Sequence, residues 1–584
     1  MMAPEQDKTH VENGAVAADT TPFEEAVALT GQGRFHYALL AVCGFCLISM
    51  IFESLAAAYV TPAAQCDFDM TSFEKGFLGG TIYIGMIVSS HVWGFVADTR
   101  GRRLVLLLTL ALDFVCSVVA AFMPSLPLLI FVRFLNGVWI CGPSAVTYAY
   151  LGEFHAYKTR TQSMVYACIF IAFAIIAQPG LAWLVIPQPW EVPLGGIVLR
   201  SWRVFLILGA VPSAATFLGL YFLLPESPKF LLAVGRHDEA LGVLRRMFAA
   251  NSGLPPDKYL VRALEVDPTS SPSSAGVDAK SPLAVARHMW RQTAPLFKPP
   301  YLLYTLLACV IQFGLYASSN GFLIWLPELL NRVGQYRDLY PDQTATVCDV
   351  IAVMADQAAS PVLLGPSEPD HYSQFFDALG SMAGNWTEPD AGANVTAEAL
   401  AAVLGNSSWS EEASLPAGTE DAAPGAASCV ATVSVTSFQN SLITGAGSAV
   451  AYISISFIIR LVTKKTIITV SLAVSGVCGV CTIWAQTELQ ILMLPLAFMV
   501  LSGMCVSVVN TVVVDSFPTY LRAMAVCLSL CCGRLGTFVT SLMLGALIDS
   551  SCVLAVAVLG GFVFVCGVLS MLLPSEAKMK ELRH

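Results

Sequence analysis

The stretch Gly94-Phe-Val-Ala-Asp98-Thr-Arg100-Gly101-Arg102-Arg103 joins two long apolar segments and contains one carboxylate and three arginines. Lys and Arg that flank membrane segments stay in the cytoplasm, so this short basic turn predicts two membrane helices joined on the cytoplasmic side. Gly94 and Gly101 are small enough to let backbones approach closely. Asp98 can accept hydrogen bonds from the N-terminus of a neighbouring helix or from Arg102 and Arg103. A basic flank that only stops translocation would explain the arginines but not the aspartate and the glycines.

The composition of the whole chain is that of a membrane protein. It has 584 residues, of which 56% are hydrophobic and 12% are charged, whereas soluble domains carry about a quarter charged residues. A helix needs about 20 apolar residues to cross the bilayer. The N-terminus shows no removable signal peptide, so we expect the first membrane helix to direct insertion. Twelve stretches are long and apolar enough to span, near 37–60, 77–97, 104–123, 126–150, 164–186, 202–224, 301–329, 438–460, 466–486, 489–513, 523–548 and 552–573.

The charges of the connecting segments predict the topology. Counting from a cytoplasmic N-terminus, every turn expected inside carries Lys or Arg, and the turns expected outside are mostly poor in positive charge. Both termini are therefore expected in the cytoplasm. The expected organisation is a cytoplasmic tail at 1–36, a six-helix half at 37–224, a cytoplasmic connector at 225–300, a seventh helix at 301–330, an outer loop at 331–437, helices 8–12 at 438–573 and a cytoplasmic tail at 574–584.

The long outer loop holds most of the acidity of the chain. Residues 331–437 contain fourteen Asp and Glu against two basic residues, Arg332 and Arg337, and the chain as a whole has a net charge of −10. The acidity therefore says little about a nucleic-acid partner, and none is expected. Three N-glycosylation acceptor sequences lie in this loop, which supports its placement in the lumen or outside the cell. They begin at Asn385, Asn394 and Asn406.

Cysteines near the outer face suggest a disulfide. Cys348 and Cys429 lie near the two ends of the outer loop, and an oxidising lumen permits a bond between them. Cys66 and Cys552 also lie near the outer face, so the pairing is not unique.

Several motifs resemble those of the major facilitator superfamily. The opening stretch resembles its signature loop, and further matches cover nearly all of residues 35–575. Two six-helix halves are the architecture that this resemblance implies, with the substrate held between them near the bilayer midplane. The other matches are the Arg133–Gly137 motif in the fourth helix, Glu153 with Arg160 as an acid–base pair after it, Pro225-Glu226 at the end of the sixth helix as in sugar and organic-cation porters, and Asp515 to Arg522 after the tenth helix.

The resemblance narrows to the synaptic vesicle glycoprotein 2 family. Gly33-Arg34-Phe35, Ser201-Trp202-Arg203-Val204-Phe205 and a large glycosylated loop between helices 7 and 8 are similar to that family. The outer loop here lacks the repetitive aromatic pattern of the vertebrate proteins. The second-half copy of the signature loop is reduced to Arg460-Leu-Val-Thr-Lys464-Lys465.

Four ionisable residues are expected inside the bilayer, where such groups are costly and point to function. Glu53 and Arg133 both lie about 10 Å from the outer face by helix rise, on helices 1 and 4, which the family resemblance makes neighbours. Three interpretations stay open: a protonatable gate, a permanent structural pair, and an Arg133 that snorkels to the surface. Asp113 could serve function or only hydrogen-bond a polar neighbour. Arg534 could attract an anionic group or pair with a carbonyl.

Aromatic and amide side chains on the expected helices 1, 4, 5, 7 and 10 are candidates for lining a substrate cavity. Trp325 and Tyr166 fall where the vesicle-family resemblance places cavity aromatics. Aromatic faces with amide edges suit sugars and amphipathic cations alike. Hydrogen bonding between helices is the alternative for each residue. The amide candidates are Asn136, Gln178, Gln312, Asn320 and Asn510.

These patterns predict a secondary transporter rather than an enzyme. We see no Gly-rich phosphate loop and no His/Cys cluster with metal spacing, so ATP-driven transport, a metal and a cofactor are not expected. We expect alternating access of a small organic solute, sugar-like or ionic, with a proton or another ion as candidate coupling partner. Salt bridges between the cytoplasmic motifs would lock the inner gate. The alternative is a regulatory or receptor glycoprotein of a vesicle membrane that transports little or nothing. The plasma membrane and a secretory or synaptic-type vesicle are the expected locations, and the sequence identifies no protein partner.

Overall fold

The computed structural model describes residues 20–194, 197–265, 287, 290, 291, 293–340, 345–359, 435–458 and 462–573. Residues Met1–Asp356 and Val430–His584 form one compact unit, which holds all the contacts reported below. The glycosylation candidates Asn385, Asn394 and Asn406 lie outside the described residues, as does Cys429.

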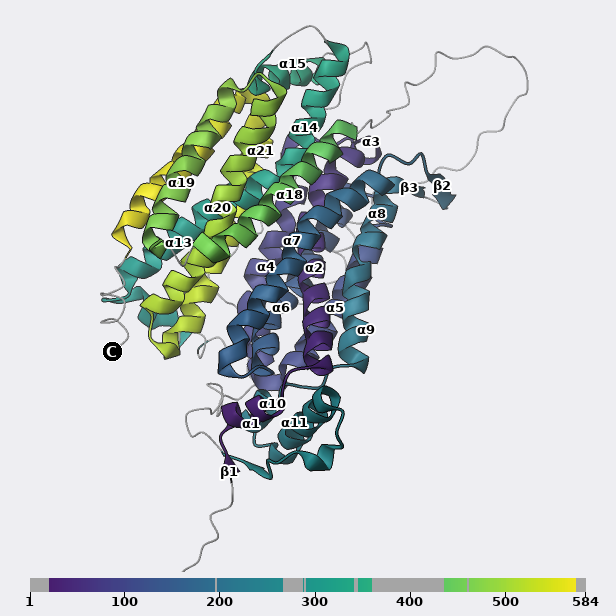
Figure 1. Cartoon of the computed structure of the whole chain (residues 1–584). Helices are drawn as coiled ribbons and strands as arrows, with labels where there is room; N and C mark the ends of the chain where they lie inside the picture. Colours follow the sequence, from purple (N-terminus) through teal and green to yellow (C-terminus); the bar gives the residue numbers. More distant parts are fainter. Residues whose placement is uncertain are drawn as a thin grey trace, which may run out of the picture. The chain divides into compact units, whose positions relative to one another are not determined.

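The first half of the chain is built from long helices that pack against one another (Figure 1). α4 contacts α5 and α6, and α2 contacts α6, α7 and α9. Strands β2 (Glu191–Leu194) and β3 (Ile197–Arg200) form a short antiparallel hairpin. The helices are α2 (Arg34–Ala63), α3 (Gln65–Phe68), α4 (Ser72–Arg100), α5 (Arg102–Ala120), α6 (Leu126–Glu153), α7 (Tyr157–Val185), α8 (Ser201–Gly209) and α9 (Val211–Phe222).

The second half repeats this pattern of long packed helices. α21 contacts α13 and α19, and α20 contacts α19. Contacts between the halves run from α4 to α21, from α7 to α18 and from α2 to α14. The helices are α13 (Leu302–Tyr316), the π-helical segment η4 (Ala317–Gly321), α14 (Phe322–Leu339), α15 (Val347–Ala359), α18 (Val435–Ile458), α19 (Lys464–Cys481), α20 (Glu488–Ser516) and α21 (Thr519–Leu569).

Among the described residues, the stretches expected to span the membrane are largely helical, although 202–224 is divided into α8 and α9 and 301–329 into α13, η4 and α14. Ten candidate spans are found among the described residues by length and composition. Two expected stretches, 523–548 and 552–573, share α21, whose backbone leaves helical geometry at Ser551 with φ −155° and ψ 64°. The stretch 438–460 corresponds to α18, which is not among the ten. The all-α membrane fold is therefore confirmed.

The N-terminal segment and the connector meet beside the first half. β1 (Thr20–Thr21) pairs in parallel with β4 (Ala263–Leu264). The short helix α1 (Phe23–Leu29) follows β1, and α10 (Pro228–Ala233) and α11 (His237–Ser252) follow α9 (Figure 1). We call the ends of the helices next to the turns at Gly101, Phe154 and Pro225 the connector end.

The opposite ends of the helices carry α3, the β2–β3 hairpin and α15 (Figure 1). We call this the loop end, because α15, which belongs to the segment expected as the outer loop, lies there. Large apolar side chains between the two ends face outward. Phe131 is 57% exposed and Leu184 is 70% exposed, which suits a surface that contacts lipid.

Candidate functional site: ion pairs within and between the two halves

The opening motif and the Pro225-Glu226 motif meet at the start of α5. The Glu226 carboxylate accepts hydrogen bonds from the backbone N–H groups of Arg102 at 3.0 Å and Arg103 at 3.1 Å. A carboxylate is stabilised at a helix N-terminus because the first N–H groups have no partner within the helix. Gly101 fits here because its φ of +106° is unfavourable for other residues and because a Cβ would collide with Glu226.

Arg102 ties the same motif to α6. Its guanidinium lies 3.0 Å from Asp98 and 3.2 Å from Glu153, and it stacks over the ring of Phe230 at 5.1 Å. Both carboxylates belong to the first half. The motif therefore fastens α4, α5 and α6 together in this conformation, and its ion pairs with described residues all lie within the first half.

Two expectations for these motifs are wrong. Glu153 does not pair with Arg160, because Arg102 takes Glu153 and Arg160 lies 2.7 Å from Glu24 of α1 instead. Gly94 does not mediate a close backbone approach, because a Cβ there would meet no described atom within 4 Å.

The other signature residues stabilise each half separately. At Gly137 a Cβ would collide with the carbonyl of Ile82, so this glycine lets α6 lie directly against α4. Asp515 pairs with Lys464 at 2.7 Å, within the second half. Arg522 follows at the start of α21, and its Nε has no hydrogen-bond partner among the described residues. The expected inner lock across the halves is thus not formed by ion pairs between described residues.

A buried ion pair lies between α2 and α6. Arg133 Nη1 is 2.8 Å from Glu53 Oε2, and Nη2 donates to the Glu53 carbonyl at 2.5 Å. Both side chains are 3% exposed. The expected contact is present, and the interpretation in which Arg133 snorkels to the surface is wrong. Removing one partner of such a pair typically costs about 3–5 kcal/mol, because a buried charge is left unpaired.

A hydrogen-bonded chain leads from this pair to a second buried carboxylate. Ser117 donates to Glu53 at 2.6 Å, and Asn136 donates to Ser117 at 2.7 Å and to Asp113 at 3.2 Å. Ser213 donates to the other Asp113 oxygen at 2.8 Å. Asp113 therefore belongs to the same network as Glu53. The network holds two carboxylates and one guanidinium, so one carboxylate has no cation of its own.

The remaining cavity candidates do not converge on one place. Gln312 donates to Asn510 at 2.8 Å inside the second half, while Gln178 donates to the Phe52 carbonyl at 2.8 Å beside Glu53. The side-chain oxygens of Gln178 and Gln312 are buried without a partner among the described residues.

Two further candidates lie apart from both groups. Tyr166 is 45% exposed and accepts from Gln162 of the same helix at 2.7 Å. Asn320 lies in the π-helical segment η4, a deviation that is frequent at functional sites.

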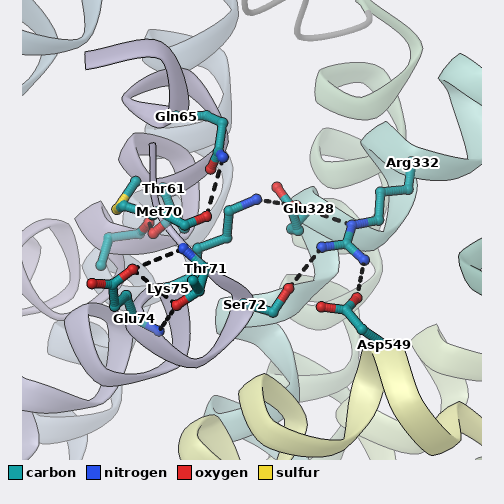
Figure 2. A network of polar contacts seen from close by, with 11 residues as sticks. Thr61, Gln65, Met70, Thr71, Ser72, Glu74, Lys75, Glu328, Arg332 and Asp549 are labelled. Atoms are coloured by element: carbon teal, nitrogen blue, oxygen red, sulfur yellow. Dashed lines mark hydrogen bonds and ion pairs between the residues drawn. The ribbon is translucent and has the colours of Figure 1, made fainter. Parts of the chain in front are cut away.

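The two halves are joined at the loop end by a cluster of charges (Figure 2). Lys75 in the first turn of α4 lies 2.7 Å from Glu328 of α14. Arg332 lies 3.1 Å from Glu328 and 2.7 Å from Asp549 of α21, and it donates to Ser72 at 3.1 Å. The Lys75 and Glu328 side chains are 9% and 7% exposed. Two cations and two anions balance, so the cluster can be buried without an unpaired charge.

Neutral contacts extend this closure along α21. Ser541 donates to the Gly76 carbonyl at 2.8 Å, and a Cβ at Gly76 would collide with the Ser541 carbonyl. The Ser541 carbonyl also accepts a hydrogen bond from the Trp325 indole N–H at 3.1 Å. Trp325 is only 3% exposed, so in this conformation it closes the loop end and does not line an open cavity.

The disulfide at this end differs from the first candidate. Cys348 of α15 is bonded to Cys552, next to the break in α21, with 5.4 Å between the two Cα atoms. The expected partner Cys429 is therefore wrong. Cys552 is within bonding reach of Cys348 because α15 and the break at Ser551 both lie at the loop end.

The match to a known family is specific. The sequence model of the family described as sugar (and other) transporter matches residues 33–356, more than half of the chain. The chain belongs to this family. It is a multi-pass membrane protein of the major facilitator superfamily.

Relatives of this family member include vesicle proteins. Synaptic vesicle glycoprotein 2A of Bos taurus is 30% identical over 328 residues, 53% of this chain and 44% of that protein. Synaptic vesicle glycoprotein 2B of Mus musculus is 29% identical over 322 residues, 53% of this chain and 47% of that protein. The match thus spans less than half the length of these relatives.

Solved structures agree on the fold of this family member. The inward-open xylose transporter XylE from E. coli aligns with a TM-score of 0.59 and 12% identity, covering 94% of this chain and 100% of that one. A D-xylose-proton symporter aligns with a TM-score of 0.55 and 11% identity, covering 94% and 99%.

Sequence reasoning missed the loop-end cluster of this family member. Lys75 falls just before the expected span 77–97, whereas Glu328 falls inside the expected span 301–329, in its last turn, and should have been counted with the intramembrane charges. Their signal was opposite charge at the same expected depth on helices of different halves. In the sequence, Arg203 stands out only through the family resemblance. In the structure it caps the end of α5 by donating to the carbonyls of Ala121 and Met123 at 2.9 Å.

Proposed function

We propose that this protein is a secondary transporter that moves a small organic solute by alternating access, and that the structure represents a state closed at the loop end. The observation that carries the proposal is the ion pair of Lys75 with Glu328 across the halves. At the connector end, the ion pairs between described residues stay within one half or its attached N-terminal segment, as for Arg102 with Glu153 and Lys464 with Asp515. A lock at one end only is what a two-gate mechanism requires in one of its end states.

The orientation of the gates follows from the charge of the loops. Basic turns mark the connector end as cytoplasmic, so the Lys75–Glu328 cluster is the outer gate. In the opposite state this cluster would separate, and the signature loop with its exposed Asp98 would approach the second half. Asp98 is 59% exposed in its side chain here, which leaves it available for such a contact.

The Glu53–Arg133 network is the proposed site of proton coupling. Two buried carboxylates share one guanidinium, and an uncompensated buried carboxylate is costly, so charge balance favours one proton on the network. The hydrogen bonds through Ser117 and Asn136 join the two carboxylates into one network, so the charge on Glu53 affects Asp113 as well. Support comes from the fold shared with a solved structure named as a D-xylose-proton symporter. Protonation of Glu53 would weaken its hold on Arg133 and so loosen α2 from α6.

A second candidate function comes from the relatives. Synaptic vesicle glycoproteins 2A and 2B are similar over 53% of this chain, and a vesicle-membrane glycoprotein with a regulatory role would keep the same fold. Uptake by the purified protein in liposomes separates the two. A panel of sugars, organic cations and carboxylates is applied with and without an inward proton gradient. Gradient-stimulated uptake of a panel member supports transport, and absence of uptake across the panel in folded protein supports the regulatory alternative.

A further inference from the structure

Arg534 is a half-buried cation at the junction of the two halves, and its hydrogen-bond partners are neutral. It lies near the middle of the first part of α21, and its guanidinium contacts α6 of the first half. Nη2 donates to Ser144 at 2.6 Å, and Nη1 lies 3.7 Å from the Cys141 sulfur. Among the described residues no carboxylate forms an ion pair with it.

Four other cations of the described helices, buried or nearly so, each pair with a carboxylate. Lys75 and Arg332 share Glu328, Arg133 pairs with Glu53, and Arg203 with Asp67. An unpaired charge in a membrane interior is expensive and is retained for function. Arg534 alone of these cations lacks an anion from the described part of the chain, so an anion from outside the protein would complete the site.

The surroundings of Arg534 fit an organic anion. Tyr83 of α4 and Tyr316 of α13, one from each half, lie within electrostatic range of Arg534. Neither hydroxyl has a hydrogen-bond partner among the described residues. Gly533, the neighbour of Arg534, lies against the Tyr316 ring, where a Cβ would come within 2.7 Å of it. Aromatic faces with free hydroxyls favour a flat apolar body that carries polar atoms at its rim.

We propose that Arg534 binds the carboxylate of the transported solute, and that the substrate is therefore a small organic monoanion with an aromatic or apolar body. One guanidinium neutralises one negative charge, and its planar fork matches a carboxylate with two parallel hydrogen bonds. A neutral sugar would leave the charge of Arg534 uncompensated. This inference rests on the proposed transport function, because it names the substrate class of that cavity.

The test compares benzoate with benzamide, which have the same shape and differ in charge. Binding to the purified full-length protein is measured by calorimetry at neutral pH. We expect the wild type to bind benzoate at least tenfold more tightly than benzamide. In Arg534→Gln that preference should fall to about onefold, and in Arg534→Lys it should be reduced several-fold but not lost, because a point charge replaces the fork. Arg236→Gln, which removes an exposed arginine of the connector, should keep the full preference.

Tyr83→Phe provides a second test of the site in case the Arg534 variants do not fold. It keeps the ring and should weaken benzoate binding several-fold while the protein stays monodisperse. Equal binding of benzamide, no benzoate binding to folded wild type, or a preference that survives in Arg534→Gln would each overturn the inference. Uptake of a sugar in liposomes without benzoate binding would reject the inference and leave transport intact. Benzoate binding that depends on Arg534, without uptake of any solute, would reject transport and leave the anion site intact.

Discussion

Lys75 and Glu328 belong to different halves of the chain, and their side chains form a buried ion pair with 2.7 Å between Nζ and Oε1. Because Arg332 links Glu328 to Asp549 as well, three helices are held together at the loop end by one balanced cluster. Separating the halves there requires these charges to find other partners. The cluster therefore has the chemistry of a gate, and its closed state is the one observed.

Replacing Glu328 by Gln should open this gate. The change keeps the shape of the side chain but leaves Lys75 and Arg332 with one carboxylate between them, and truncating one member of a buried pair costs on the order of 3–5 kcal/mol. We expect amide hydrogen exchange to become at least tenfold faster in residues 72–78 and 544–551. Glu488→Gln, which removes the exposed partner of Arg337, is the matched control. Unchanged exchange in both segments would show that the cluster does not hold the loop end closed.

Removing the Glu226 carboxylate should destabilise the connector end. In Glu226→Ala the first N–H groups of α5 lose their acceptor, and loss of a cap costs about 1 kcal/mol, up to about 2. We expect the melting temperature in detergent to fall by a few degrees. Glu239→Ala removes an exposed carboxylate paired with Arg236 at i,i+3 and should change it little. Equal effects of the two variants would contradict the capping role.

The stability of the connector end should fall on acidification through His155. Burial lowers the pKa of His155 to about 4, partly opposed by its hydrogen bond with the Leu151 carbonyl and reinforced by His36 and Arg160. The unfolded chain has a histidine pKa near 6.5, so between about pH 6.5 and 4 the unfolded state binds more protons and stability declines by at most about 1.4 kcal/mol per pH unit. Above that range His155 is neutral in both states and contributes no pH dependence.

The measurement is the melting temperature between pH 8 and pH 5. The wild type should lose stability below pH 6.5 more steeply than His155→Gln, whereas His237→Gln, which removes an exposed histidine of α11, should keep the wild-type slope. Parallel slopes for wild type and His155→Gln would refute the assignment.

The Cys348–Cys552 bond should be detectable by thiol labelling. In Cys552→Ser a maleimide should label Cys348 after mild unfolding without reductant, whereas Cys348 of the wild type should stay unlabelled. The melting temperature should also fall, since loss of a native disulfide typically costs about 2–5 kcal/mol. Cys168→Ser, which removes an exposed free thiol, should leave stability unchanged. Labelling of Cys348 in the wild type would disprove the bond.

The fold could be predicted from the sequence because hydrophobic length and loop charge are one-dimensional signals. The positions of Glu53 and Arg133 were also predictable, since helix rise places both at one depth. Contacts between segments that are distant in the sequence were not predictable. Nothing near Gly101 in sequence indicates that Glu226 caps the helix that follows it, and Arg160 finds Glu24 only because α1 folds back beside α7.

The loop-end cluster was missed for a related reason. Lys75 lies in the first turn of α4 and Glu328 lies at the end of the expected span 301–329, where a sequence window does not distinguish a solvated end from a buried contact between halves. The cavity candidates failed differently. Gln312 and Asn510 are polar residues on expected helices, but their mutual hydrogen bond depends on helix rotation, which the apolar composition of α13 and α20 does not fix.

The most direct test of proton-coupled alternating access is the pH profile of solute uptake by Glu53→Gln in proteoliposomes between pH 5 and 8. The variant keeps the shape of the side chain but can neither take up nor release a proton. Glu74→Gln, in the exposed capping box at the start of α4, is the matched control and should behave as wild type. We expect wild-type uptake to rise with an inward proton gradient and Glu53→Gln to lose that stimulation. Uptake by Glu53→Gln with the wild-type rate and pH profile would contradict the account.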